Sequence, residues 1–216
     1  MIRPQLCRSG CWRCAYGCPF GAKWTVRDFV DEAVAHGATL LDAAKVQRVI
    51  VENGAARGVE FVRNGQAQRA LAGVVVLAGG GTGSPRLLHS SGLMPAGASF
   101  FSDPVVAVMG SVDDIDGGAE VPMAAGLRLD ADGISLADMT LPKPMYQGFA
   151  AQVGRFDRLF AHRRTLTIMV KIRDEIGGSI GPRWVDKAFQ PADRKKLAEG
   201  VGMARDVLKA AGARHV

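Results

Sequence analysis

The sequence predicts a mixed fold in which an α/β part and an α+β part share one chain of 216 residues. Val74–Leu77 is a continuous apolar run, typical of a strand that is buried on both faces in a parallel sheet. Asn53-Gly54 and Asn64-Gly65 lie between apolar stretches and predict hairpin turns, which join antiparallel strands. A mixture of parallel and antiparallel structure follows from these observations.

The elements of the first part follow in chain order. Thr25 is typical of a helix N-cap and Gly37 of a helix end, which predicts a helix over residues 26–36. Two strands are expected next, at Ala38–Leu41 and at Val46–Val51. The chain then turns at Asn53-Gly54 and returns as a strand through Gly58–Val62.

A glycine-rich turn follows the apolar run at Val74–Leu77. The run enters Ala78, Gly79, Gly80 and Gly81, after which Ser84 is expected to be the N-cap of a helix whose first residue is Pro85. A strand, a glycine turn and a helix start in this order present backbone N–H groups to a phosphate or a cofactor ring. A tight turn packed against a neighbouring strand is the structural alternative.

The second part is richer in β-like stretches. Residues 142–148 are expected to form a loop and residues 149–160 a helical segment. A final helix is predicted from Pro191, and Gly212 ends it. The expected strands are Val105–Val112, Leu127–Asp130 before the turn Asp132-Gly133, and Leu166–Ile172.

Composition and charge exclude several classes of protein. The net charge is +6, but aromatic residues make up only 6% and no nucleic-acid motif is present, so a solvated basic surface is favoured and no nucleic-acid partner is expected. No apolar run approaches the roughly 20 residues that span a bilayer, so no transmembrane segment is expected. The first residues have no apolar core of a secretory signal, which predicts a cytoplasmic location.

Four cysteines lie within twelve residues, and no other cysteine occurs in the chain. Cys7, Cys11, Cys14 and Cys18 follow the spacing C-x3-C-x2-C-x3-C-P. Disulfides would be spread to tie distant loops together, so this clustering argues against them. From Cys11 onward the spacing matches that of bacterial ferredoxins, which predicts one iron–sulfur cluster, 4Fe-4S or 3Fe-4S, held by all four cysteines. A zinc site and free thiols are the alternatives.

Three stretches carry a resemblance to a known family. They are Gly17-Cys18-Pro19-x-Gly21-Ala22-Lys23, then Ala56-x-Gly58-Val59-Glu60 with Val75–Gly80, and Ser84-Pro85-Arg86-Leu87-Leu88-x-x-Ser91-Gly92-Leu93. Together they resemble the glucose–methanol–choline (GMC) oxidoreductases, and the third is similar to the second signature of that family. It departs from the signature at Gly81 and Met94. The resemblance spans nearly the whole chain and is sharp over residues 17–93.

The resemblance implies part of a doubly wound FAD-binding domain over residues 24–100 and part of an antiparallel-sheet substrate domain over residues 101–216, after a cysteine-rich loop over residues 1–23. In the family, a valine contacts the adenine of FAD through its backbone, and Val46 matches that position. The resemblance also places Ala78, Gly79, Gly80 and Ser84 near the FAD.

The implied reaction is the oxidation of a CH–OH group in a small-molecule alcohol or sugar. A base takes the hydroxyl proton, hydride passes to the flavin, and electrons then leave through the iron–sulfur cluster to an external electron-acceptor protein. The alternative is an iron–sulfur electron-transfer or metal-binding module that works without flavin.

Two features of the family are missing from this sequence. The chain has no G-x-G-x-x-G motif for the FAD pyrophosphate, and none of its four histidines matches the catalytic position. We therefore expect the middle portion of a larger enzyme, inactive alone, and assign no catalytic residue.

Overall fold

The computed structural model describes residues 3–8, 11, 13–93, 97–118 and 120–216. The chain divides into two compact units, which are described separately. The first unit comprises residues 1–28, 103–174 and 189–216, and the second comprises residues 29–102 and 175–188. Among the described residues, no helix combines the length and the apolar character needed to cross a membrane.

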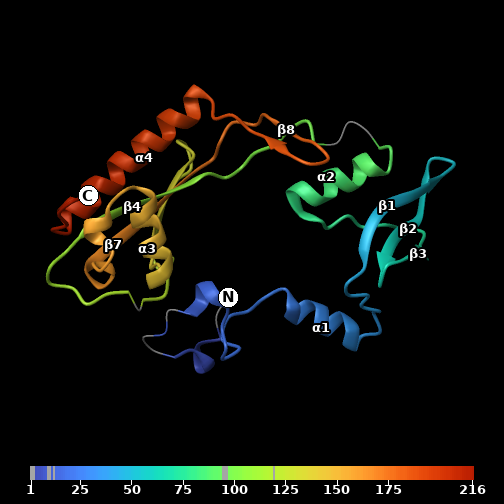
Figure 1. Cartoon of the computed structure of the whole chain (residues 1–216), viewed down its shortest axis with the longest axis horizontal. Helices are drawn as coiled ribbons and strands as arrows, with labels where there is room; N and C mark the ends of the chain where they lie inside the picture. The colour runs from blue at the N-terminus through green and yellow to red at the C-terminus, as the bar shows by residue number, and fades with distance from the viewer. Residues whose placement is uncertain (1–2, 9–10, 12, 94–96, 119) are drawn as a thin grey trace. The chain divides into compact units, whose positions relative to one another are not determined.

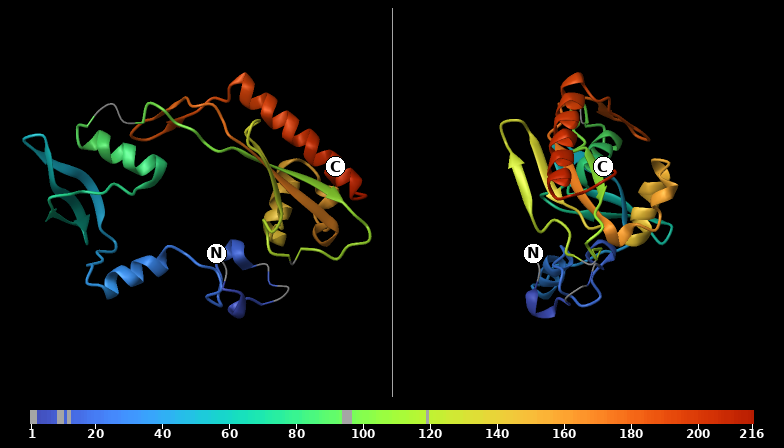
Figure 2. Two further views of the ribbon diagram at one scale, coloured as in Figure 1. Left: turned by 180° about the vertical axis from the view of Figure 1, so that it is seen from behind. Right: turned by 90° about the vertical axis from the view of Figure 1, so that its left-hand side faces the viewer.

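The predicted mixed fold is confirmed, because helices accompany antiparallel sheets in both units (Figures 1 and 2). In the second unit three strands pair in the order β1-β2-β3 and a separate two-stranded hairpin joins β8 to β9. The elements are α1 (Arg27–Ala35, which begins in the first unit), β1 (Lys45–Glu52), β2 (Ala55–Arg63), β3 (Gln66–Leu71), α2 (Gly80–Ser90), β8 (Ser179–Ile180) and β9 (Val185–Asp186).

Both predicted hairpin turns are present, and the backbone explains the residues found there. Asn53 and Gly54 have φ of 50° and 76°, and Asn64 and Gly65 have φ of 52° and 76°. Two consecutive residues in the left-handed region form the turn whose twist matches that of paired strands, and asparagine and glycine tolerate it best. The helix predicted over residues 26–36 also forms, as α1.

Two predicted strands are wrong. Ala38–Leu41 is irregular, and Leu40 and Leu41 are exposed. Val74–Leu77 is also irregular, and the exposed fractions of Val74 and Val76 are 78% and 82%. A strand buried on both faces requires neighbouring strands and covering layers. Within the described part of the chain no strand pairs with residues 74–77, so the doubly wound sheet is not formed there.

The first unit contains a four-stranded antiparallel sheet in the order β4-β7-β6-β5. Its predicted strands and its final helix are confirmed. Its elements are η1 (Pro4–Leu6), η2 (Arg13–Tyr16), β4 (Val105–Ser111), β5 (Gly126–Leu129), β6 (Ile134–Asp138), α3 (Lys143–Gln152), η3 (Phe156–Arg158), η4 (His162–Arg164), β7 (Thr165–Ile172) and α4 (Pro191–Ala210).

The loop predicted over residues 142–148 is wrong, because Pro142 is the N-cap of α3 and the helix runs to Gln152. Proline and glycine in this stretch are typical of loops. Tertiary contacts override that preference, since Tyr146 and Ala150 of α3 are buried. The helical segment predicted over residues 149–160 is correct only to Gln152 and at η3.

The alternation of side chains along β4 separates the two faces of this sheet. Val108 packs with Val170, Ala204 and Leu208 in the core beneath α4. The intervening residues Val105, Ala107, Met109 and Ser111 point to the opposite face, because successive side chains of a strand alternate. That opposite face becomes one wall of the cavity described below.

Helix α4 approaches the sheet closely at a glycine. A Cβ atom at Gly200 would lie 2.5 Å from Val170 Cγ1 and 3.2 Å from Ile134 Cγ2. Both of those side chains are almost completely buried and have little room to move. Gly202 lies two residues further along α4, and a Cβ there would have no atom within 4 Å.

We predict that Gly200→Ala lowers the free energy of unfolding by about 1–2 kcal/mol, because overpacking outweighs the gain in helix propensity. Gly202→Ala, the matched control, should raise it by up to about 1 kcal/mol. Urea unfolding of the two variants followed by tryptophan fluorescence measures both. Equal stabilisation by the two substitutions would contradict the close approach of α4.

Candidate functional site

The glycine turn lies at the N-terminus of α2, but the helix begins earlier than predicted. Gly79 is the N-cap, and Ser84 and Pro85 lie inside the helix. Ser84 is therefore not the N-cap. Its Oγ still accepts a hydrogen bond of 3.0 Å from the N–H of Gly79, which satisfies a backbone donor at the helix start.

The turn leaves its backbone open to a ligand. Gly80 has φ of 74°, and a Cβ at Gly80, Gly81 or Gly83 would have no atom within 4 Å. The first N–H groups of a helix have no partner within the helix, and the helix dipole adds partial positive charge at this end. A phosphate or another anionic group of a cofactor fits this arrangement.

The other end of α2 is tied to β1. Ser91 Oγ accepts a hydrogen bond of 2.8 Å from the N–H of Val49, and Ser90 Oγ donates one of 2.6 Å to the carbonyl oxygen of Gln47. Val46, which is 39% exposed, is the neighbour of Gln47 on this strand. Since α2 has 11 residues and is about 16 Å long, the glycine turn and the bonded residues Gln47 and Val49 lie at opposite ends of it.

The cysteines lie in a loop that is closed by Arg3. The N–H of Arg3 donates to the carbonyl oxygen of Ala22 at 2.7 Å, and its guanidinium donates to Gly21 at 2.9 Å and pairs with Asp28 at 2.7 Å. Lys23 Nζ donates to the carbonyl oxygen of Cys14 at 2.9 Å. These bonds hold the two ends of the cysteine-containing segment together.

All four cysteines line one small cavity within this loop, beside three cationic side chains. The cavity is lined by Cys7, Cys11, Cys14, Cys18, Arg8, Arg13, Lys23, Phe20 and Ala22. The thiols are free and partly buried. However, across the described ranges no three histidine, cysteine, aspartate or glutamate side chains are near enough to hold one metal ion. The predicted ligand set is thus gathered in one loop but is not arranged as a metal site.

Cys18 differs from the other three cysteines in its backbone environment. The backbone N–H of Lys23 is the main cause of a lowered pKa of the Cys18 thiol, and the N–H groups of Phe20, Ala22 and Gly21 act in the same direction. Hydrogen bonds to a thiolate stabilise the charged form. Partial burial of Cys18 opposes the shift without cancelling it.

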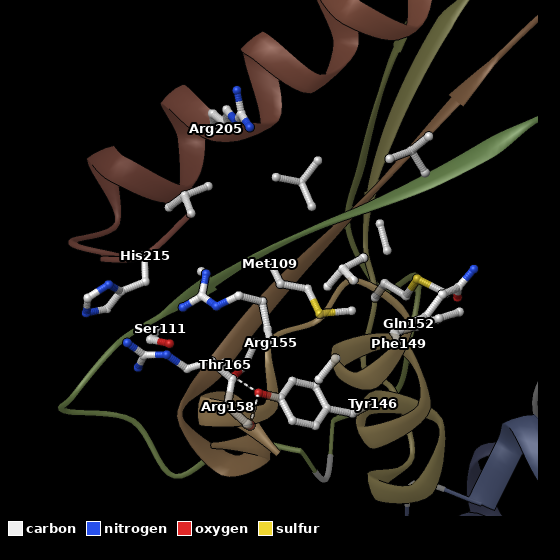
Figure 3. Close-up of a pocket in the computed structure, with 18 of the residues that line it drawn as sticks. Met109, Ser111, Tyr146, Phe149, Gln152, Arg155, Arg158, Thr165, Arg205 and His215 are labelled. Carbon is white, nitrogen blue, oxygen red and sulfur yellow. Dashed lines mark hydrogen bonds between the residues drawn. The ribbon is translucent and has the colours of Figure 1, made fainter. Parts of the chain in front are cut away.

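A cavity with a volume of about 660 Å³ lies in the first unit. One wall is edge strand β4, and others come from α3 and from the end of α4. Figure 3 shows Met109 and Phe149 lining the interior, while Arg155 and Arg158 reach toward Ser111 and His215 at one end.

Tyr146 links helix α3 to two other elements that line this cavity. Its side chain is only 3% exposed, and its hydroxyl donates to the carbonyl oxygen of Arg158 at 2.7 Å. The same hydroxyl lies 3.3 Å from Thr165 Oγ1 (Figure 3). These contacts connect α3, η3 and β7.

Asp157 binds two arginines that line the cavity. Its carboxylate accepts two bonds of 3.0 Å from Arg155 and one of 2.9 Å from Arg158. The hydrogen bonds from Arg155 are the main cause that lowers the pKa of Asp157 to about 2, so the carboxylate stays charged at neutral pH. The ion pairs orient both guanidinium groups, although exposed pairs of this kind add little stability.

The sequence analysis did not identify Tyr146, Arg155, Arg158 or Thr165. They lie on α3, η3 and β7 and meet only in the folded chain. No local motif marks them, and residues 142–148 were expected to be a loop.

The chain is similar to several known proteins. Residues 4–106 match the profile of the GMC oxidoreductases. An uncharacterised GMC-type oxidoreductase of Mycobacterium tuberculosis is 30% identical over 97% of this chain and 36% of its own length. A long-chain-alcohol oxidase of Arabidopsis thaliana is 26% identical over 95% of this chain and 32% of its own length. The chain therefore spans about a third of the length of these relatives.

A solved structure shares the fold. The crystal structure of pyridoxine 4-oxidase from Mesorbium loti has a TM-score of 0.66 and 18% identity, and the match covers 92% of this chain and 46% of that one. A C-glycoside 3-oxidase of Arthrobacter globiformis is 34% identical over 55% of this chain and 23% of its own length.

We predict that Cys18 is alkylated faster than Cys7, Cys11 or Cys14 at pH 7 in metal-free, reduced protein. Its lowered pKa gives a larger fraction of thiolate, which is the nucleophile. Timed iodoacetamide labelling with peptide mass spectrometry measures the four rates, and Lys23→Ala should preserve the difference because the donors are backbone groups. Equal rates at all four cysteines would contradict the hydrogen-bonded thiolate.

Proposed function

We propose that the chain belongs to the GMC oxidoreductase family and forms part of an FAD-dependent enzyme that oxidises a CH–OH group of an alcohol or sugar. One observation carries the proposal: an open glycine turn lies at one end of α2, and the strand that contains Val46 is bonded to the other end. The helix length of about 16 Å is compatible with an extended dinucleotide cofactor.

The residues present fit FAD in their chemistry. The unpartnered N–H groups in the first turn of α2 suit its phosphates or the polar edge of its ring, and the missing side chains at Gly80 and Gly81 allow close approach. Ala78 and Gly79 lead into this turn, and the bond from Gly79 to Ser84 fixes its shape. Val46 would face the adenine through its backbone.

The work of this chain would be binding and orientation. A bound flavin supplies a hydride acceptor for the carbon of the alcohol. The turn at Gly79–Gly81 would hold the cofactor at the helix N-terminus, and the cavity between β4 and α3 would hold the body of the substrate away from water. We name no catalytic base within this chain.

A second part of the proposal concerns Cys7, Cys11, Cys14 and Cys18 as ligands of an iron–sulfur cluster, 4Fe-4S or 3Fe-4S. Support comes from their shared cavity, from the cations around it and from the hydrogen bonds that favour a thiolate at Cys18. The described side chains do not converge on one metal position, so the loop must close around the cluster when it binds. We derive no electron-transfer step from it.

We predict that FAD binds the chain and that Gly80→Ala weakens this binding about tenfold or more, because a methyl group would enter the open space at the turn. Gly54→Ala is the matched control, since Gly54 has φ of 76° and equally open surroundings but lies in a hairpin turn. Each substitution should cost about 1 kcal/mol of stability through the positive φ.

Quenching of flavin fluorescence measures both affinities, and urea unfolding measures both stabilities. If Gly54→Ala and Gly80→Ala reduce FAD affinity equally, the effect comes from stability and the glycine turn is not the cofactor site.

We predict that protein purified without oxygen contains iron and acid-labile sulfide in near-equal amounts, and that Cys14→Ser lowers both by more than half. Metal and sulfide assays on one sample measure this, with Cys14→Ser compared to Ser9→Ala as a substitution in the same segment. Zinc without sulfide, or no metal in either protein, would overturn the cluster and leave the proposed flavin site untouched.

A further inference from the structure

The 660 Å³ cavity of the first unit separates an apolar interior from a cationic end. Its interior is formed by the edge strand β4, together with Phe149, Val153 and Val201. The charged side chains in the lining are Arg155, Arg158 and Arg205, and no acidic side chain lines it. His215 lies at the same end as Arg155 and Arg158 (Figure 3). We propose that this cavity binds an organic carboxylate with an apolar body.

The charge balance at the cationic end favours an anion. Asp157 pairs with both Arg155 and Arg158, lies outside the lining and offsets one of these two positive charges. A guanidinium has five N–H donors, more than the bonds to Asp157 use, and its planar fork can donate two parallel hydrogen bonds to a further carboxylate. An uncharged alcohol would leave this excess charge without a partner.

Asp157 acts here as a positioning residue. It binds the Nε edges of Arg155 and Arg158 and thereby fixes the direction of both guanidinium groups. Tyr146 also helps to position Arg158, because its hydroxyl donates a hydrogen bond to the carbonyl oxygen of that residue. A preorganised pair of arginines loses less conformational entropy when a ligand binds than two mobile side chains would.

The apolar interior indicates that the rest of the ligand is hydrocarbon. Val105, Ala107 and Met109 lie in a row along β4, and Phe149 and Val153 come from α3 and the residue that follows it. A cavity of this volume accommodates a molecule of small to medium size, and Arg155, Arg158 and His215 lie together at one end of it (Figure 3). A straight hydrocarbon chain with a terminal carboxylate has the matching division.

This inference deepens the proposed function, and it rests on that function only for the statement that the bound carboxylate is the substrate of oxidation. The ligand would then be a hydroxy acid, or another alcohol that carries a carboxylate at its far end. Binding of the carboxylate itself does not depend on flavin.

The test compares three probes of one chain length: octanoate, octan-1-ol and octylammonium. Isothermal titration with the full chain should give an affinity for octanoate about tenfold higher than for octan-1-ol, and weaker binding still for octylammonium. Arg158→Gln should weaken octanoate about tenfold and leave octan-1-ol unchanged. Arg128→Gln is the control, since Arg128 also pairs with a neighbouring aspartate but does not line the cavity.

Asp157→Asn gives a second, independent measurement that distinguishes charge from fold. It removes the carboxylate that orients both arginines, so affinity for octanoate should fall while affinity for octan-1-ol stays constant. Such a selective loss supports the cationic end as the carboxylate site, and an unchanged affinity for octanoate would contradict the positioning role of Asp157. Octanoate that binds no more tightly than octan-1-ol, or variants that change both equally, would overturn the inference.

A titration with FAD on the same samples separates this inference from the proposed function. Octanoate binding without FAD binding would overturn the flavin site and support the cavity. FAD binding without octanoate binding would overturn the carboxylate and support the flavin site.

Discussion

Two serines at the end of α2 fix the geometry on which the cofactor site depends. The bonds from Ser90 and Ser91 to Gln47 and Val49 anchor the helix C-terminus against an edge strand. The helix is rigid, so the glycine turn is held about one helix length away from Gln47 and Val49. Loss of these bonds would leave the turn intact but would remove its fixed distance from the strand.

In the first unit, β4 takes part in both the hydrophobic core and the cavity. β4 packs against α4, where Gly200 allows close contact, and the same strand also lines a cavity. Two arginines of that cavity come from a short stretch after α3, in which Asp157 orders both. In each unit, hydrogen bonds therefore hold polar groups at or just after the end of a helix, α2 in one unit and α3 in the other.

Much of the fold could be predicted because its causes are local. Asn53-Gly54 and Asn64-Gly65 adopt the positive φ that only such residues favour, and Pro191 begins a long helix in which the capping box of Gln190 and Asp193 satisfies the first turn. The failures have tertiary causes. Val74–Leu77 has the composition of a buried strand but no partner strand among the described residues, and α3 forms despite Pro142 and Gly148 because Tyr146 is buried. The cysteine spacing predicted a shared loop but not the positions of the sulfur atoms, and nothing in the sequence linked Arg155 with Thr165.

Hydrogen–deuterium exchange of the chain with and without FAD tests the central claim most directly, because exchange rates report on backbone amides at both ends of α2. The account predicts that FAD slows exchange in peptides that cover Gly79–Thr82 and Lys45–Gln47 together, while those from α4 stay unchanged. Protection at neither place, or at the glycine turn without β1, would contradict a cofactor that extends from one end of α2 to the other.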